Sequence, residues 1–267
     1  MVFAYETGLI GPLRDRPARS GTVSARAGPR RRDRHGHRLR DRDRPEAGRA
    51  WLVTVGGMPR TSPSVALDAM LAGNRRFVAG TPEHPNQDAA RRAQLTPGQE
   101  PFAVILGCSD SRLAAEIIFD QGLGDLFVVR TAGHVLGAEV LGSVEYATSV
   151  LGCRLVVVLG HDSCGAVAAA RAAVENGLPA AGFVRDVVER VTPSVLAARA
   201  AGLTEDSDII DEHIRHTAQL LMDRSRVLSE QVETGEVAVV GLAYQLAEGS
   251  ARMVTSHGVE SMEGATR

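Results

Sequence analysis

The sequence predicts an α/β fold, with a mainly parallel central β-sheet flanked by helices and a helical N-terminal arm. Near-continuous apolar runs at 102–106, 155–159 and 237–242 have the length and composition of strands that are covered on both faces. Amphipathic stretches of helical length separate these runs. Strands that alternate with helices indicate a parallel sheet with right-handed crossovers.

The N-terminal arm is the first expected helix and covers residues 65–78. Ser62 or Ser64 can cap its first turn, where Pro63 is also tolerated. The Gly-Thr-Pro sequence at 80–82 ends it. Its apolar positions form an approximate stripe, so we expect one face of this helix to be buried.

The rest of the chain continues this alternation. Apolar runs predict strands at 102–106, 126–129, 155–159 and 237–244. Helical patterns predict helices at 89–95, 114–120, 138–151, 165–173, 183–199 and 209–232. His213 and His216 lie about one turn apart on the last of these helices. They could carry protons, but we expect them on a solvated face.

Composition narrows the classes of protein to consider. The chain has 267 residues, enough for one sizeable core, and only 4% of them are aromatic, so the core must be aliphatic. No apolar run approaches the roughly 20 residues that a membrane-spanning helix needs. The three cysteines are an odd, small number, which argues against a disulfide scaffold and favours the cytoplasm.

The charge is unevenly distributed along the chain. The net charge is −2, but residues 1–57 carry 13 Arg against 6 acidic residues. Such a segment can bind nucleic acid through phosphates, or it can be a targeting segment. It shows no helical or strand period, so we expect a disordered Arg-rich extension, or sequence upstream of a true start at Met58. We do not expect nucleic acid as a partner.

Two of the predicted strands run directly into potential metal ligands. Cys108 follows the apolar run at 102–106, and His161 and Cys164 follow the run at 155–159. Two strands of one parallel sheet deliver such residues to the same edge, where ligands bind in open α/β sheets. Two thiolates and one imidazole make a zinc site with three protein ligands and one open position, which is typical of catalytic zinc.

The two motifs that contain these ligands resemble the paired signature of β-class carbonic anhydrases. They read Cys-Ser-Asp-Ser-Arg at 108–112 and Gly-His-Asp-Ser-Cys-Gly at 160–165. The resemblance extends from Met58 to about Ser250, and it implies that residues 58–267 are the catalytic domain. It also implies one zinc ion per chain, reversible hydration of carbon dioxide to bicarbonate and a proton, and a homodimer or homotetramer.

The resemblance assigns roles to further residues. Asp110 is expected to accept a hydrogen bond from the nucleophile, and Arg112 to hold Asp110 ionised through a charge-assisted pair. In the substrate pocket, Gln99 is expected to donate a hydrogen bond to the substrate. Phe127 and Tyr146 are expected to form apolar walls, and the backbone N–H of Gly165 to face the substrate oxygen. In the family, some of these walls come from the partner subunit.

The chain departs from the family pattern at one place near the site. Many members read Arg-Asn-x-Ala-Asn where this chain has Arg-Thr-Ala-Gly-His at 130–134. His134 lies near the site loops, where it could be an ordinary buried histidine or could carry protons. Cys153 follows a helix-ending glycine, and we expect a buried thiol that is not a ligand.

Three other functions remain open at the level of sequence. An enzyme on the same scaffold could hydrolyse carbon disulfide or carbonyl sulfide, depending on the access route to the zinc. A zinc-binding regulatory protein without activity is a second possibility, against which the intact Asp110–Arg112 pair argues. A nucleic-acid-binding protein that uses the Arg-rich segment is the third.

Overall fold

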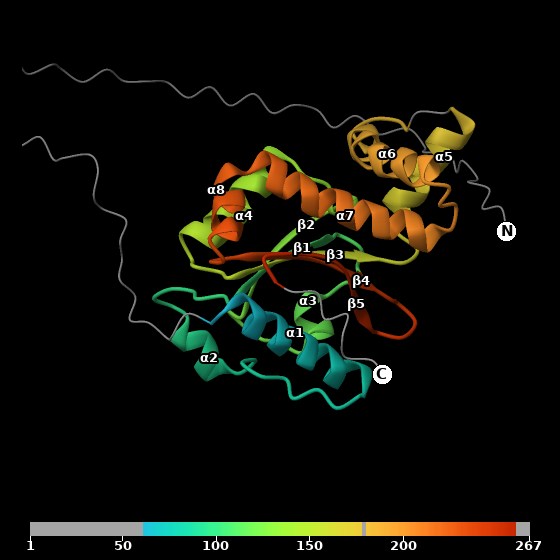
Figure 1. Cartoon of the computed structure of the whole chain (residues 1–267). Helices are drawn as coiled ribbons and strands as arrows, with labels where there is room; N and C mark the ends of the chain where they lie inside the picture. The colour runs from blue at the N-terminus through green and yellow to red at the C-terminus, as the bar shows by residue number, and fades with distance from the viewer. Residues whose placement is uncertain (1–60, 178–179, 260–267) are drawn as a thin grey trace, which may run out of the picture. The chain divides into compact units, whose positions relative to one another are not determined.

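The computed structural model describes residues 61–177 and 180–259, so the predicted extension at 1–57 lies outside the described residues. The predicted α/β fold is confirmed. The strands form one five-stranded sheet in the order β2-β1-β3-β4-β5 (Figure 1). The first four strands are parallel, and the last is antiparallel to its neighbour. Their bounds are β1 Ala103–Cys108, β2 Leu126–Thr131, β3 Leu155–His161, β4 Ala238–Tyr244 and β5 Ala251–His257.

The burial of each strand explains whether its apolar residues could be recognised in the sequence. Every residue of β1, β3 and β4 is buried, because helices cover both faces of the sheet there. The edge strand β5 is mostly half-buried and mixes polar with apolar residues, so no apolar run marks it, and the sequence analysis missed it. It pairs with β4 across an irregularity at Gly241/Leu242.

Helices lie on both sides of the sheet (Figure 1). One side carries α1 Pro63–Val78, α2 Ala89–Gln94 and α3 Ala115–Ile118, and the other carries α4 Ala138–Ser149, α7 Asp206–Arg224 and α8 Arg226–Glu233. A 3-10 turn, η1 Ala132–His134, follows β2, and α5 Gly165–Asn176 packs against α6 Val184–Ala200. Within the described ranges, no helix combines the length and apolarity needed to cross a membrane.

The single helix predicted over 209–232 is wrong, because the chain breaks into two helices at Ser225. Its backbone is extended there, with φ −106° and ψ 99°. The Ser225 hydroxyl accepts a hydrogen bond from the N–H of Leu228 and so caps α8, and it donates a bond to Glu145 on α4. A serine in mid-pattern competes with the helix in this way only when a partner is close in space. By contrast, Ser62 caps α1 as expected.

Two strand glycines make room for Ile214 of helix α7 against the sheet. A β-carbon added at Gly160 on β3 would lie 2.6 Å from the Ile214 side chain, and one added at Gly241 on β4 would lie 2.5 Å from it. Real β-carbons do not approach so closely. Ile214 is fully buried in this hollow, so the glycines set the height of α7 above the carboxyl-terminal half of the sheet.

We predict that Gly241→Ala destabilises the protein by about 1–3 kcal/mol, because the new methyl group overlaps both Ile214 and Thr255. Urea unfolding measures the change. Gly142→Ala is the matched control, since Gly142 is an exposed residue of α4 and its added β-carbon meets no neighbour within 4 Å. The control should gain up to about 1 kcal/mol from helix propensity. Equal stability of the two variants would contradict this account of α7 packing.

Candidate metal centre

Three potential ligands meet at the carboxyl-terminal edge of the sheet, as predicted. Cys108 is the last residue of β1, His161 is the last residue of the adjacent parallel strand β3, and Cys164 precedes the first residue of α5. All three side chains are buried. Their ligand atoms, two Sγ and one imidazole nitrogen, lie within 4.8 Å of one another.

The donor set fits zinc. With Zn–S bonds of about 2.3 Å and tetrahedral angles, two sulfurs lie about 3.8 Å apart, so the observed cluster needs only a small contraction. His161 Nδ1 lies 2.7 Å from the carbonyl oxygen of Asp162, which can only accept, so Nδ1 carries the proton. Nε2 is buried and has no hydrogen-bond partner among the described residues. Cys108, His161 and Cys164 therefore form the zinc site, with one position left for a further ligand.

The pKa values of the two thiols shift in opposite directions. The pKa of Cys108 is lowered, chiefly by the hydrogen bond from the Cys164 thiol and, against the cost of burial, by His161 and the N–H groups of Asp110 and Gly133. The same hydrogen bond and burial raise the pKa of Cys164. The Gly133 N–H lies 3.3 Å from Cys108 Sγ. Bound zinc would stabilise both thiolates, since cysteine binds the metal in its deprotonated form.

An ionised carboxylate stands beside this centre. Arg112 donates to Asp110 from Nε at 2.9 Å, from Nη2 at 2.7 Å and from its backbone N–H at 2.9 Å. These bonds hold the pKa of Asp110 well below its usual range. Asp110 Oδ2 lies 4.0 Å from His161 Nε2, so the carboxylate faces the side of the site where the ligands converge.

Arg130 holds the loop that follows β1 in place, and the sequence analysis did not assign it this role. It lies on β2 opposite Gly107 of β1. Its Nε donates to the carbonyl oxygen of Cys108 at 3.0 Å and its Nη2 donates to the carbonyl oxygen of Asp110 at 2.6 Å. An arginine at the carboxyl end of the neighbouring strand was the available signal. Arg130 thus links the backbone carbonyl groups of the ligand residue Cys108 and of Asp110.

The expected substrate residues fall into two groups. Gly165 begins α5, directly after Cys164, and lies at the metal centre. Phe127 is paired with Val104, four residues or about 13 Å of strand from the pair formed by Thr131 and Cys108. Phe127 contacts Tyr146, with ring centroids 6.2 Å apart.

Gln99 lies farther from the metal centre. It is exposed and precedes β1, so the whole strand separates it from Cys108. Gln99, Phe127 and Tyr146 thus lie away from the metal centre of their own chain.

His213 is buried, and the expectation of a solvated face is wrong for this residue, although His216 is half-buried. Burial lowers the pKa of His213 to about 4, so its ring is neutral. The ring packs against His134, with centroids 4.4 Å apart, and burial also lowers the pKa of His134. Cys153 is buried as expected, and burial raises its pKa to about 12.

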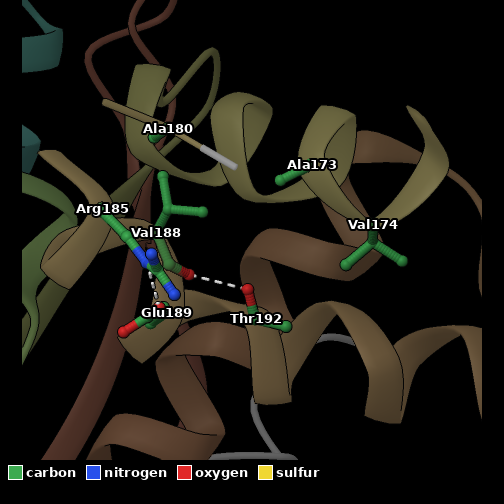
Figure 2. Close-up of a pocket in the computed structure, with 7 residues that line it drawn as sticks. All are labelled: Ala173, Val174, Ala180, Arg185, Val188, Glu189 and Thr192. Carbon is green, nitrogen blue, oxygen red and sulfur yellow. Dashed lines mark hydrogen bonds and ion pairs between the residues drawn. The ribbon is translucent and has the colours of Figure 1, made fainter. Parts of the chain in front are cut away.

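A hollow of about 160 Å³ lies between α5 and α6 (Figure 2). Its polar groups are already paired: Arg185 Nε lies 2.6 Å from a Glu189 carboxylate oxygen, and the Thr192 hydroxyl donates to the Val188 carbonyl at 2.8 Å. The remaining lining is aliphatic, from Ala173, Val174 and Ala180. Cys108, His161 and Cys164 do not line this hollow.

Comparisons with known proteins agree with this geometry. The family model for carbonic anhydrase matches residues 103–251. Carbonic anhydrase 2 of Mycobacterium tuberculosis is 57% identical over 194 residues, which cover 73% of this chain and 94% of the relative. The β-carbonic anhydrase CafA of Aspergillus fumigatus is 26% identical with a TM-score of 0.53, covering 74% of this chain and 93% of its own.

A structure of the tetrameric β-carbonic anhydrases of Sordaria macrospora shares the fold, with a TM-score of 0.56 at 19% identity, and the match covers 72% of this chain and 96% of that one. The family model matches more than half of the chain, and the mycobacterial relative matches nearly three quarters of it. The chain therefore belongs to the β-class carbonic anhydrases.

Proposed function

We propose that Asp110 and Arg112 are the catalytic residues of this carbonic anhydrase, and that a second copy of the chain completes its substrate pocket. The reaction is the reversible hydration of carbon dioxide to bicarbonate and a proton. The observation that supports the proposal best is the position of the Asp110 carboxylate, held ionised beside three ligand atoms within 4.8 Å of one another.

The proposed roles follow from the hydrogen-bond geometry. Zinc bound by Cys108, His161 and Cys164 supplies a nucleophile derived from water at neutral pH. Asp110 can only accept hydrogen bonds while it is ionised, so it orients an O–H group that faces it. Arg112 holds the carboxylate in position through two side-chain bonds. The N–H of Gly165, at the positive end of α5, favours the negative charge that develops on substrate oxygen.

The separation between the two groups of substrate residues supports a pocket shared between subunits. Gln99 and Phe127 are separated from their own metal centre by most of a strand, yet Gln99 is exposed and the Tyr146 side chain beside Phe127 is 46% exposed. We propose that these three residues line the metal centre of a partner subunit in a homodimer or homotetramer. The related proteins of Sordaria macrospora are tetrameric.

The same ligands restrict where the enzyme can work. Two cysteine thiols must remain reduced to bind zinc, so we propose a reducing compartment such as the cytoplasm, which cell fractionation would test.

We predict that carbon dioxide hydration, measured by stopped-flow at about pH 7 and about pH 8.5, rises in proportion to zinc content. Cys164→Ala should lose both zinc and turnover, because it removes one of the three ligands. Cys153→Ala is the matched control, since this cysteine is buried away from the ligand cluster and should keep both. A zinc-loaded wild-type protein without turnover would instead favour the carbon disulfide or carbonyl sulfide hydrolase, or the inactive zinc protein.

We predict that Asp110→Asn keeps stoichiometric zinc and lowers kcat by at least about 100-fold, because the amide cannot replace an ionised acceptor. Metal analysis and stopped-flow kinetics on the same sample give both quantities. Asp211→Asn is the control, since it also breaks a carboxylate–arginine pair, with Arg252, but lies on α7. Near-normal kcat in Asp110→Asn would remove Asp110 from the catalytic residues.

We predict that Gln99→Ala and Asp110→Asn chains complement each other in mixed oligomers. In a mixed dimer, the Gln99→Ala chain has an intact metal half-site and receives an intact Gln99 from its partner. Random mixing should therefore restore about a quarter of wild-type turnover from two impaired parents. No recovery after verified subunit exchange would show that Gln99 does not act across the interface. Full activity of Gln99→Ala alone would remove it from the pocket.

A further inference from the structure

Three hydrogen bonds link helix α6 to the zinc ligand Cys108 through His213 and Gly133. Ser194 Oγ lies 2.9 Å from His213 Nδ1, and His213 Nε2 lies 2.8 Å from the carbonyl oxygen of Gly133. The N–H of Gly133 then lies 3.3 Å from Cys108 Sγ. Ser194 and His213 are 0% and 1% exposed, so water does not compete for these bonds.

The direction of each bond in this chain is determined by its chemistry. A carbonyl oxygen only accepts, so His213 Nε2 must carry the ring proton and donate it to Gly133. The ring is neutral, which leaves a lone pair on Nδ1, and the Ser194 hydroxyl donates to it. All three donors therefore point toward the sulfur. The carbonyl and the N–H of Gly133 belong to adjacent peptide groups, so His213 acts on the sulfur contact by fixing the position of Gly133.

The backbone that receives the His213 bond is held in an unfavourable shape. Gly133 has φ 63° and ψ 25°, and His134 has φ 42°, so two consecutive residues are left-handed. Left-handed backbone is costly for a residue with a side chain and persists only where neighbours hold it. A β-carbon at Gly133 would lie 2.7 Å from the Ala166 β-carbon. His213 supports this turn twice, by its bond to Gly133 and by packing on the His134 ring.

The position of His213 is itself set by the sheet. Its neighbour Ile214 sits in the hollow over Gly160 and Gly241, which fixes α7 at the height from which the imidazole reaches Gly133. Ser194, on the adjacent helix α6, then fixes the ring. These contacts connect three elements, η1, α6 and α7, behind one metal ligand.

We propose that His213 is a positioning residue for the metal centre: together with Ser194 it holds the Gly133 amide on the Cys108 thiolate and so slows the loss of zinc. A histidine that only filled the core would need no hydrogen bond to Gly133, the residue whose N–H donates to the Cys108 sulfur. Outer-shell partners of metal ligands typically change metal affinity by about 10–100-fold when they are removed.

Three substitutions on the full-length, zinc-loaded protein separate this role from simple packing. The side-chain nitrogen of His213→Gln can occupy the place of Nε2 and donate to Gly133. The shorter His213→Asn can replace only Nδ1, so it loses the bond to Gly133. Ser194→Ala removes the hydroxyl that fixes the ring and alters the core less. Leu221→Ala is the control, because it opens a cavity on the same helix away from these contacts.

The first readout is the rate of zinc release to a chelator, with urea unfolding measured in parallel. We expect His213→Asn to release zinc at least about 10-fold faster and Ser194→Ala to lie between it and wild type. His213→Gln should stay close to wild type. Leu221→Ala should be less stable to urea yet release zinc at the wild-type rate.

The second readout is the sulfur-to-metal charge-transfer absorption of the cobalt-substituted protein. Loss of an N–H···S bond raises the energy of the sulfur lone pairs, so the band should move to longer wavelength in His213→Asn and Ser194→Ala only. Wild-type zinc release and an unmoved band in Ser194→Ala and in any folded His213→Asn would overturn the proposal. Equally fast release from Leu221→Ala would overturn it too, because global stability would then explain the effect.

Discussion

The parallel pairing of β1 with β3 is the constraint on which the metal centre depends. The register places Gly107 opposite Leu159, so the two strands end at the same level and present Cys108 and His161 at one edge. A slip of one residue would turn the ligand on one strand to the opposite face of the sheet. Both strands are fully buried, so such a slip would force every apolar side chain of the shifted strand to pack against the helices on the other face of the sheet.

The groups around the ligands lie on two sides of the metal centre, one exposed and one buried. Asp110 and Arg112 lie on the exposed side, where the carboxylate stays ionised and faces the open position. Behind the ligands, Arg130 binds the loop carbonyls and the amide of Gly133 binds the Cys108 sulfur. The exposed side therefore carries the ionised carboxylate that we propose acts in the reaction, whereas the buried side supplies hydrogen bonds to the ligand residue Cys108.

The length of the sheet also bears on assembly. Gly165 lies at the carboxyl-terminal edge of the sheet with the ligands. Phe127 lies near the amino-terminal end of β2, and Gln99 precedes the amino-terminal end of β1. A rigid sheet cannot fold back to join these positions within one chain. A pocket built from both groups needs a second copy, so the active site and the oligomer would depend on each other.

The sequence by itself determined the alternation of strands and helices, the three zinc ligands and the Asp110–Arg112 pair, because each rests on local order: an apolar run, the residue that follows it, and a spacing of two. The tertiary structure alone decided that Ser225 breaks a helix, that residues 251–257 form an edge strand, and that His213 is buried behind Cys108. In each case, the deciding partner is distant in sequence. Glu145 accepts a hydrogen bond from Ser225, and β4 pairs with β5. Gly160 and Gly241 leave space for Ile214, and this packing places the neighbouring His213 beside Gly133.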